Sequence, residues 1–499
     1  MKKIHMRLAV LIMVLLLCLP LAVACSTPQQ DGGDDTTTNN SPADTNPENP
    51  ADTTAVNYSA NLPSDLNYNG KVFRVYAYPE NEAWSDSDWS NSGGMDGGVI
   101  NDAVYTRSAY AEEKLGITIE ITHSSAYTNC NDLVTAILSG EDLYDIANVN
   151  CLLSFFLAEN GHAVDLNTVD TLDMSAPWWD PNCVADLSVS NRNFCLTGDI
   201  GTMYKRSIST ILFNKSVFAQ HTDFPNIYDL VRDQKWTLDQ MYTMAASVAE
   251  DLDGNGVRDT NDQYGLVYFA TMASTLPIAG GVRYATKNSD DVPEMTLYSE
   301  RCINLLNKSS QLLYDQSLSY NANANNMSYD ILDEIFMSDR ALFYYGELHS
   351  AEDMRAMESD FGILPMPKFD EAQDGYHHTI NANVAAVLVV PMSNLNLDMT
   401  GYVLDTLGAE SKNVLTPAYY EINLQGQISK DVESTISLDI IISTLRYDIG
   451  YLAIRPTGSM MRALNTSFST DLASAYKRQM STINKTLEAL LESIEDNYD

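Results

Sequence analysis

Residues 251–262 carry oxygen-bearing side chains at the spacing of a calcium-binding loop. Counted from Asp251 as position one, such side chains occupy positions one, three, five, nine and twelve, which are Asp251, Asp253, Asn255, Asp259 and Asp262. Gly256 stands at position six, where an EF-hand-type loop turns sharply, and Val257 at position seven can offer its carbonyl. The acid at position twelve is shorter than the usual Glu. We expect a structural calcium ion here; the alternative is an Asp- and Gly-rich turn without an ion.

Aromatic residues supply a second candidate site. The sequence contains 28 Tyr and 5 Trp, and aromatic faces beside carboxylates and amides suit the apolar faces and hydroxyl rims of sugars. The candidate ligand-binding residues in expected loops are Trp84, Trp89, Trp178, Trp179, Asp180, Asp199, Tyr204, Tyr344 and Tyr345. The alternative for each ring is packing in the core or at a hinge, and for Asp199 it is the capping of a helix or turn.

No catalytic motif stands out among the remaining reactive residues. The sequence has no Gly-rich phosphate loop and no nucleophile elbow, and its histidines are scattered. The pair His377-His378 is predicted to lie in a surface turn. Acids are so abundant that a pair spaced for glycoside hydrolysis cannot be recognised from the sequence. We therefore predict a protein that binds rather than an enzyme, with no catalytic residues.

The chain is strongly acidic, with 67 Asp and Glu against 29 Lys and Arg and a formal net charge of −38. Such a polyanion repels nucleic acid and anionic lipid head groups. An uncharged or cationic ligand therefore fits the composition better than an anionic one, and we expect no nucleic-acid partner.

The N-terminal residues predict export and anchoring. Lys2, Lys3 and Arg7 precede an apolar run over residues 8–23 that is too short to span a membrane, which is typical of a signal peptide. Removing residues 1–24 takes the formal charge from −38 to −41. Cys25 follows small residues and resembles the acylated Cys of a bacterial lipobox, although Ala22 stands where Leu is usual. Residues 25–57 are polar and predict a disordered tether. We expect a lipoprotein outside the cytoplasmic membrane, held there by its lipid alone.

Five cysteines remain after Cys18 and Cys25 are set aside, and their spacing is irregular. They are Cys130, Cys151, Cys183, Cys195 and Cys302. An odd number at such spacing indicates neither a disulfide framework nor a zinc site. Buried free thiols are the favoured interpretation, with a disulfide between Cys183 and Cys195 as the alternative.

Strand and helix patterns alternate in the first part of the globular region. The patterns predict strands at 70–78, 117–121 and 144–149 and helices at 99–115 and 132–139. This order favours an α/β fold with a largely parallel sheet, and the remaining length requires two lobes. A helix is predicted after Trp236, where Thr237 and Gln240 form a capping box.

Four stretches, taken in their order along the chain, resemble the type II periplasmic-binding-protein fold of extracellular solute-binding proteins. They are Ser139–Asp145, Thr197–Asp199 with Ile211–Lys215, Lys235–Asp239 with Tyr264–Leu266, and Phe361–Lys368. The segments 417–420 and 446–448 resemble a lipoprotein branch of that family. The resemblance implies two lobes joined by crossover hinge strands, with residues 58–210 plus about 362–395 in lobe 1 and residues 211–361 plus about 396–499 in lobe 2.

The same resemblance implies a monomeric substrate-binding lipoprotein that delivers a solute to the permease subunits of an ABC importer by hinge closure. The most favoured solute is a mono- or oligosaccharide. The alternatives are a secreted glycan-active enzyme, a glycan adhesion or sensing module, and a binding protein for a peptide or another non-sugar solute.

Overall fold

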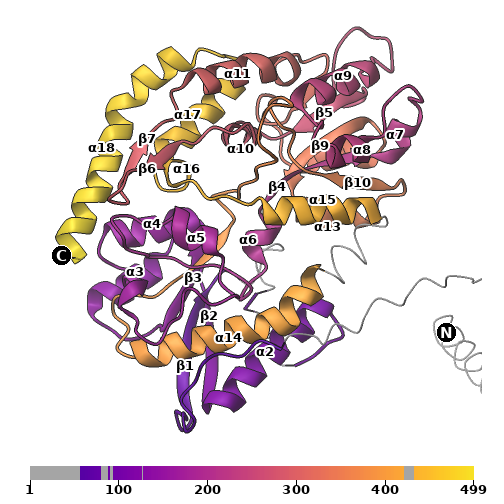
Figure 1. Ribbon diagram of the computed structural model, residues 1–499. Helices are drawn as coiled ribbons and strands as arrows, with labels where there is room; N and C mark the ends of the chain where they lie inside the picture. The colour runs from indigo at the N-terminus through magenta and orange to yellow at the C-terminus, as the bar shows by residue number, and fades with distance from the viewer. Residues whose placement is uncertain (1–56, 80–87, 90–93, 126, 421–431, 499) are drawn as a thin grey trace, which may run out of the picture. The chain divides into compact units, whose positions relative to one another are not determined.

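The computed structural model describes residues 57–79, 88–89, 94–125, 127–420 and 432–498. The predicted signal peptide, Cys25, Trp84 and nearly all of the predicted tether lie outside these residues. The two main sheets of the described chain form separate lobes, here called lobe 1 and lobe 2 (Figure 1). In the described part of the chain, no helix combines the length and the apolar character needed to cross a bilayer.

Lobe 1 is built on a four-stranded sheet in the order β11-β3-β1-β2. Its strands are β1 (Lys71–Ala77), β2 (Ile117–His123), β3 (Ile146–Asn150) and β11 (Ala386–Val389). β1 pairs in parallel with β2 and β3, and β11 runs antiparallel to β3. Its helices are α2 (Val99–Leu115), α3 (Asn131–Ser139), α4 (Cys151–Glu159), η1 (Leu166–Thr168), α5 (Pro181–Asp186), α6 (Met203–Arg206) and α14 (Leu397–Pro417). The predicted alternation of strands and helices is confirmed.

Local sequence explains how lobe 1 alternates so regularly. Gly116 and Gly140 cap the ends of α2 and α3 with φ of +64° and +73°, a left-handed conformation that glycine adopts without a steric cost. Alternate residues of β1 then face opposite sides of the sheet: Phe73 and Val75 pack in the core under α2, whereas Tyr76 packs in the core shared with lobe 2. Both faces of the sheet are therefore covered.

Lobe 2 is built on a five-stranded sheet in the order β10-β4-β9-β5-β8. Its strands are β4 (Ser209–Asn214), β5 (Tyr264–Tyr268), β8 (Ser319–Asn321), β9 (Ala341–Glu347) and β10 (Phe361–Leu364), with a separate hairpin of β6 (Ala285–Lys287) and β7 (Pro293–Met295). β5, β8 and β9 are parallel, and β4 is antiparallel to β9 and β10. Its helices are α7 (Lys215–Ala219), α8 (Ile227–Arg232), α9 (Leu238–Val248), α10 (Met272–Ala279), α11 (Glu300–Leu313), α12 (Asp330–Met337), α13 (Ser350–Asp353), η2 (Met354–Ala356), α15 (Val432–Ser443), α16 (Ile449–Leu452), α17 (Arg455–Thr466) and α18 (Leu472–Tyr498).

Helix α14 differs from the prediction that placed all of residues 396–499 in lobe 2. It packs along α2, and its apolar residues Met399, Val403 and Leu407 lie in the same core as Phe73 and Val75 of β1. The reason is its apolar stripe, which covers the open face of the lobe 1 sheet. Because α15 then packs on β10, the chain returns to lobe 2 between α14 and α15.

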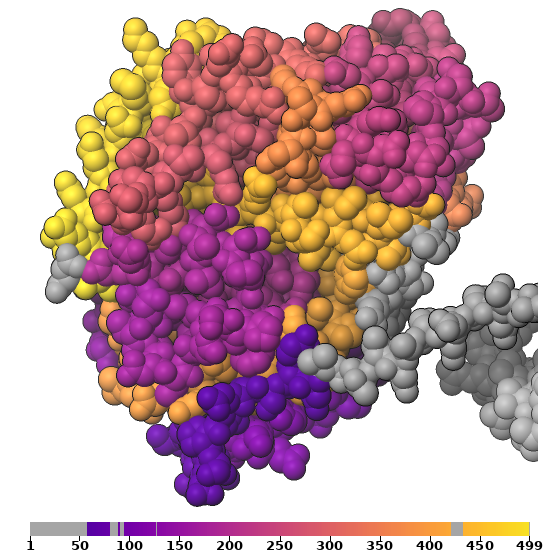
Figure 2. Space-filling view, viewed as in Figure 1, coloured from indigo at the N-terminus to yellow at the C-terminus, as the bar shows by residue number. Residues whose placement is uncertain are grey.

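The C-terminal helix α18 connects the two lobes along one side (Figures 1 and 2). Near its start, the ring of Tyr476 stacks on Tyr298 of lobe 2 with centroids 5.4 Å apart. At its end, the hydroxyl of Tyr498 donates to the carbonyl of Ala163 at 2.7 Å, and its ring lies 4.7 Å from Phe194 of lobe 1. Lobe 1 and lobe 2 are therefore joined both by the crossovers and by this helix.

The histidine pair His377-His378 is buried, so the predicted surface turn is wrong. His377 and His378 are 4% and 1% exposed. The Nε2 of His378 accepts the backbone N–H of Met366 at 3.0 Å, and its Nδ1 bonds the Thr444 hydroxyl at 2.7 Å. Burial, reinforced by His377, lowers the pKa of His378 to about 3, so His378 is neutral in the folded protein. A local pattern cannot show that residues from 444 onward cover this segment.

Two smaller predictions are confirmed. The Thr237 side chain accepts the backbone N–H of Gln240 at 3.4 Å and caps α9. The five remaining cysteines are all buried free thiols in the structure. The predicted disulfide alternative between Cys183 and Cys195 is therefore not formed in this state.

Candidate functional site

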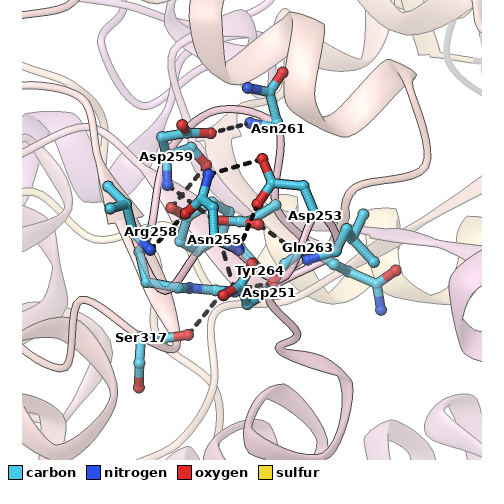
Figure 3. Close-up of polar contacts among 12 residues, drawn as sticks. Asp251, Asp253, Asn255, Arg258, Asp259, Asn261, Gln263, Tyr264 and Ser317 are labelled. Carbon is cyan, nitrogen blue, oxygen red and sulfur yellow. Dashed lines mark hydrogen bonds and ion pairs between the residues drawn. The ribbon is translucent and has the colours of Figure 1, made fainter.

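The predicted calcium loop lies in lobe 2, between α9 and β5 (Figure 3). Its ends are joined by two backbone hydrogen bonds of 3.0 Å between Glu250 and Gln263. Gly254 and Gly256 have φ of +66° and +76°. The glycine at position six therefore makes the sharp left-handed turn that such a loop requires.

Three of the predicted calcium ligands converge. Carboxylate oxygens of Asp251, Asp253 and Asp262 all lie within 4.8 Å of one another. Asp262 is buried, whereas Asp253 is exposed. The carboxylate of Asp259 is not part of this group, and it accepts the backbone N–H of Asn261 at 2.8 Å. The fold thus brings together the acids at positions one, three and twelve.

The remaining two predicted ligands face the same loop. The side-chain nitrogen of Asn255 donates to Asp253 at 2.8 Å, which keeps its amide beside the three acids (Figure 3). The oxygen of the same amide accepts the backbone N–H of Val257 at 2.6 Å, and Val257 is 61% exposed. The oxygens that converge are therefore those of the carboxylates, which hard cations such as Ca²⁺ prefer.

The acids of the loop are held mainly by backbone amides. Asp251 accepts the N–H groups of Gly254 and Gly256 at 2.8 Å each, and the bond from Gly256 is the main reason that the pKa of Asp251 is lowered. Among the described residues, the three converging acids make one ion pair, between Asp262 and Arg258 at 3.9 Å. Backbone amides therefore fix the position of Asp251 in the loop.

The tandem tryptophans are buried in lobe 1. Trp178 and Trp179 are 6% and 3% exposed, and both indole N–H groups donate to one carboxylate oxygen of Asp405, at 3.1 and 2.9 Å. Trp178 also packs so closely on α14 that a Cβ on Gly408 would lie 2.4 Å from its ring. This arrangement favours the packing alternative over a sugar platform.

Asp199 lies at the centre of a buried ion cluster. Its carboxylate accepts from Lys205 at 3.1 Å, from Lys412 at 2.8 Å and from the Thr416 hydroxyl at 2.6 Å. Burial alone would raise its pKa, but these partners hold it below the usual range. Neighbouring Tyr204 is 7% exposed, with the Lys205 ammonium 5.0 Å from its ring centroid. The cluster ties the segment before the first crossover to α14.

Tyr344 and Tyr345 lie in the core of lobe 2 on β9. They are 1% and 0% exposed. The hydroxyl of Tyr344 donates to Asp333 at 2.8 Å, and that of Tyr345 lies 2.9 Å from the hydroxyl of Thr275. Their hydroxyl groups are satisfied by the protein itself, which favours a packing role.

Trp89 and Asp180 complete the predicted set within the described chain. Trp89 is 4% exposed and lies 4.8 Å beneath the guanidinium of Arg107, whose pKa burial lowers to about 10. Asp180 caps α5 and accepts the hydroxyl of Tyr447 at 2.9 Å. Asp180 therefore links lobe 1 to the segment that precedes α16 in lobe 2.

A half-buried aromatic pair that the sequence reasoning missed lies beyond the carboxyl ends of the parallel strands of lobe 2. Phe269 follows β5, and its ring stacks on Tyr329 with centroids 4.0 Å apart. The Tyr329 hydroxyl lies 3.4 Å from that of Thr271, and the side chain of Asn323, after β8, accepts the N–H of Ala270 at 2.6 Å. Aromatic faces and amides thus gather at one edge of the sheet.

The corresponding edge of lobe 1 carries similar groups. Tyr78 directly follows β1, and its hydroxyl donates to the carbonyl of Val384 at 3.3 Å. Asn150 ends β3, where its oxygen caps α4 and its amide donates to the carbonyl of Tyr127 at 2.9 Å. Tyrosines and amides therefore stand at the carboxyl ends of the strands in both lobes.

These two edges flank the crossover segments, in which the chain passes from α6 to β4 and from β10 to β11. The N–H of Leu348, just after β9, donates to the carbonyl of Ile208 at 2.9 Å. Asn381, on the way to β11, donates from its backbone to Ser207 at 2.8 Å and from its side chain to Glu347 at 2.8 Å. Burial raises the pKa of Glu347 to about 7. Because Trp89, Trp178 and Trp179 are buried, the strand ends are the candidate ligand-binding face among the described residues.

A general rule could have found this face. In open α/β sheets, ligands bind beyond the carboxyl ends of the strands, and the predicted strand at 70–78 ends at Tyr78. Phe269 and Tyr78 close such strands, whereas Tyr329 carries no local signal that distinguishes it from the other tyrosines.

Comparison with solved structures identifies the architecture. An ABC substrate-binding protein from Listeria monocytogenes in complex with cycloalternan is similar over 84% of this chain and 99% of its own, at 14% identity and a TM-score of 0.54. A cyclo/maltodextrin-binding protein complexed with maltotetraose is similar over 86% and 97%, at 13% identity and a TM-score of 0.53. This chain has the two-lobed solute-binding fold.

UgpB from Mycobacterium tuberculosis, in complex with glycerophosphocholine, shares the same solute-binding fold over 78% of this chain and 95% of its own, at 16% identity and a TM-score of 0.53. No protein-family model matches the chain, and no curated protein sequence matches it. The predicted fold class is confirmed.

Proposed function

We propose that this protein is the substrate-binding component of an ABC importer and that its ligand is a mono- or oligosaccharide. The observation that carries the proposal is the solute-binding fold with aromatic rings and amides at the facing strand ends. Phe269 and Tyr329 offer half-buried apolar faces, and the side-chain nitrogen of half-buried Asn323 offers a hydrogen-bond donor without net charge. Such a mixed lining suits a neutral polyhydroxylated ligand.

The proposed location is the outer face of the cytoplasmic membrane, with Cys25 carrying the lipid. Support comes from the basic and apolar residues before Cys25 and from the polar segment after it. A Cys25→Ser substitution should release the chain into the medium of the producing cells. Retention of the variant on membranes, measured by fractionation, would contradict lipid anchoring.

The test of ligand class is a thermal-shift series on the chain from Ser26 onward across mono- and oligosaccharides. A ligand that binds only the folded state at a hundredfold excess over its dissociation constant stabilises it by about 2.7 kcal/mol. We expect one sugar class to raise the unfolding midpoint and to be recovered intact. Recovery of shortened sugar would establish a glycan-active enzyme instead, and no shift with any sugar would remove carbohydrate as the ligand.

A matched pair of variants tests the binding face. Tyr329→Ala should lower the affinity for the sugar found in that series by up to about tenfold, because an aromatic contact of this kind contributes about 0.5–1.5 kcal/mol. Tyr242→Ala removes a 37% exposed tyrosine from α9 and should leave the affinity unchanged. Equal affinities for the two variants would place the ligand elsewhere.

We also propose that the loop 251–262 binds Ca²⁺ in a structural role. Asp251, Asp253 and Asp262 already converge, Asn255 lies beside them, and Asp259 and the Val257 carbonyl stand at the remaining positions of the predicted loop. A bound ion would neutralise the repulsion among the acids and fix the connection between α9 and β5. No step of ligand binding depends on it.

Isothermal titration of chelator-treated protein tests this second proposal. Calcium should bind with one site, and magnesium should bind much more weakly because it demands a stricter octahedral geometry. Asp223→Asn, which removes one exposed acid from the same lobe outside the loop, should titrate like the parent chain. Absence of calcium heat at millimolar concentration would show that the loop is an ion-free turn.

A further inference from the structure

Two buried cysteines, Cys183 and Cys195, lie on opposite arms of one hairpin in lobe 1. The arms meet at a tight turn, where Val189 and Arg192 exchange two backbone hydrogen bonds of 3.0 Å. Cys183 is 0% exposed and Cys195 is 2% exposed, and both thiols pack in the same part of the hydrophobic core. The fold therefore brings the two cysteines to one place in the interior.

Hydrogen bonds on either side of the cysteines hold the two arms together. The N–H of Asp180 donates to the carbonyl of Thr197 at 2.9 Å. The side-chain nitrogen of Asn193 donates to the carbonyl of Val184 at 2.8 Å. Each cysteine stands on its own arm between these two cross-links. The register of the arms therefore sets one thiol opposite the other without any change in the path of the backbone.

Among the five thiols of the described chain, Cys195 differs in its acidity. Burial raises the pKa of Cys130 to about 11 and that of Cys302 to about 12, and it also raises the pKa of Cys151. The pKa of Cys195 is lowered, mainly by a hydrogen bond from the thiol of Cys183, whose own pKa that contact raises. Since the thiolate is the nucleophile in disulfide exchange, Cys195 is the first of the pair to react.

We propose that Cys183 and Cys195 form a redox-active pair, which becomes a disulfide when the exported chain meets a low-molecular-weight disulfide. This inference rests on the location proposed above, because disulfides form outside the cytoplasm. The Cys195 thiolate attacks the oxidant and displaces one thiolate. The Cys183 thiolate then attacks the sulfur of Cys195 in the mixed disulfide and displaces the second thiolate. Two protein thiols thus pass two electrons and two protons to the oxidant, which becomes two free thiols.

The new bond would cross-link a hairpin that contacts lobe 2. Asp180 accepts the hydroxyl of Tyr447 at 2.9 Å, and the side chain of Asn182 donates to the carbonyl of Leu445 at 2.9 Å. A cross-link between the arms reduces the freedom of the unfolded chain. The oxidised chain should therefore unfold at a higher temperature than the reduced chain.

The test is refolding of the reduced chain from Ser26 onward, in parallel with oxidised and with reduced glutathione. This chain retains the five cysteines of the described residues. Thiols are then counted under denaturing conditions, and the intact mass separates an internal disulfide from added glutathione. Oxidation should leave two thiols fewer than the five of the reduced sample. Five thiols in both samples would show that the pair does not form.

Alanine variants identify the pair. Cys183→Ala and Cys195→Ala should each prevent the internal disulfide and remove the difference in unfolding midpoint between oxidised and reduced samples. Cys151→Ala, in the same core, and Cys302→Ala, on α11 of lobe 2, should keep both effects. Because each variant is compared with its own reduced form, the cost of the substitution itself cancels. An internal disulfide in Cys183→Ala would assign the oxidation to another pair and overturn the proposal, whereas the sugar series tests the proposed function separately.

Discussion

Two groups of charged residues, one around Asp199 and one in the loop 251–262, differ in how the negative charge of their aspartates is balanced. Asp199 is buried among Lys205, Lys412 and Thr416. The acids at 251, 253 and 262 converge to within 4.8 Å, yet their described ion pair is the distant one with Arg258. The first group is complete as a structural element. The second group holds negative charge that an external cation can balance.

The comparison teaches that the origin of the counter-charge decides the role of an acid. Lys412 lies 213 residues from Asp199 in the chain, so no local pattern could pair them. In the loop, by contrast, the partners of the acids are amides within a few residues. An acid cluster balanced by remote cations stabilises the fold, whereas one balanced only by its own backbone is suited to a metal ion.

The largest expected effect is at Asp199. Asp199→Ala leaves the buried ammonium of Lys205 without its partner and should lower the free energy of unfolding by about 3–5 kcal/mol. Chemical denaturation measures the loss. A loss below about 1 kcal/mol would show that the cluster is not a structural element and would remove the contrast between the two groups.

Glu347 forms no ion pair within the described part of the chain, and it extends the comparison to pH. Its pKa rises to about 7 in the folded state, from an ordinary 4.5, because it is buried. It therefore stabilises the fold below about pH 4.5, and this contribution is lost as pH rises towards 7; the difference is on the order of 3 kcal/mol. Glu347→Gln should remove this fall in stability between about pH 5 and 7. An unchanged pH profile would assign the titration to another group.

Removing an acid from the loop should have a much smaller effect on the free energy of unfolding than removing Asp199. Asp253→Asn removes one of three mutually repelling charges, so without calcium the free energy of unfolding should change by no more than about 0.5 kcal/mol. The same variant should lose the stabilisation that calcium gives the parent chain. Thermal unfolding with chelator and with calcium separates the two cases, and a large loss under chelator would make this acid structural like Asp199.

A smaller effect than at Asp199 or Glu347 is expected at Asp180, which is balanced by backbone N–H groups and one hydroxyl. Tyr447→Phe removes the 2.9 Å hydrogen bond between the lobes and should cost about 1 kcal/mol. Tyr105→Phe, at a 44% exposed tyrosine, is the matched control. Equal stabilities would mean that this contact between the lobes contributes nothing.

Much of the fold could be predicted because its signals are local. The predicted helix at 99–115 is observed as α2 with the same bounds, and Thr237 caps α9 as its spacing indicated. The position of α14 could not be predicted in this way. Its apolar stripe shows that it packs on a sheet, but only tertiary structure decides between the two sheets available.

The candidate sites also differ in whether their sequence signal is local. The calcium loop is a contiguous motif, and three of its acids converge as their spacing requires. The candidate ligand-binding face is assembled from strand ends that are far apart in sequence, so no single segment indicates it. The adjacent residues Trp178 and Trp179 were predicted instead, although their rings are buried. Burial depends on what packs against a ring, here Asp405 and α14, and a single stretch of sequence does not contain that information.

The length of α18 limits how the two lobes can move. Its 27 residues form a helix about 40 Å long that packs on lobe 2 at one end and on lobe 1 at the other. A helix of fixed length resists motions that separate the two surfaces on which it packs, whereas rotation of the lobes about the helix axis is less restricted. The contacts of Tyr476 with Tyr298 and of Tyr498 with Ala163 therefore restrain motions that move lobe 1 away from lobe 2.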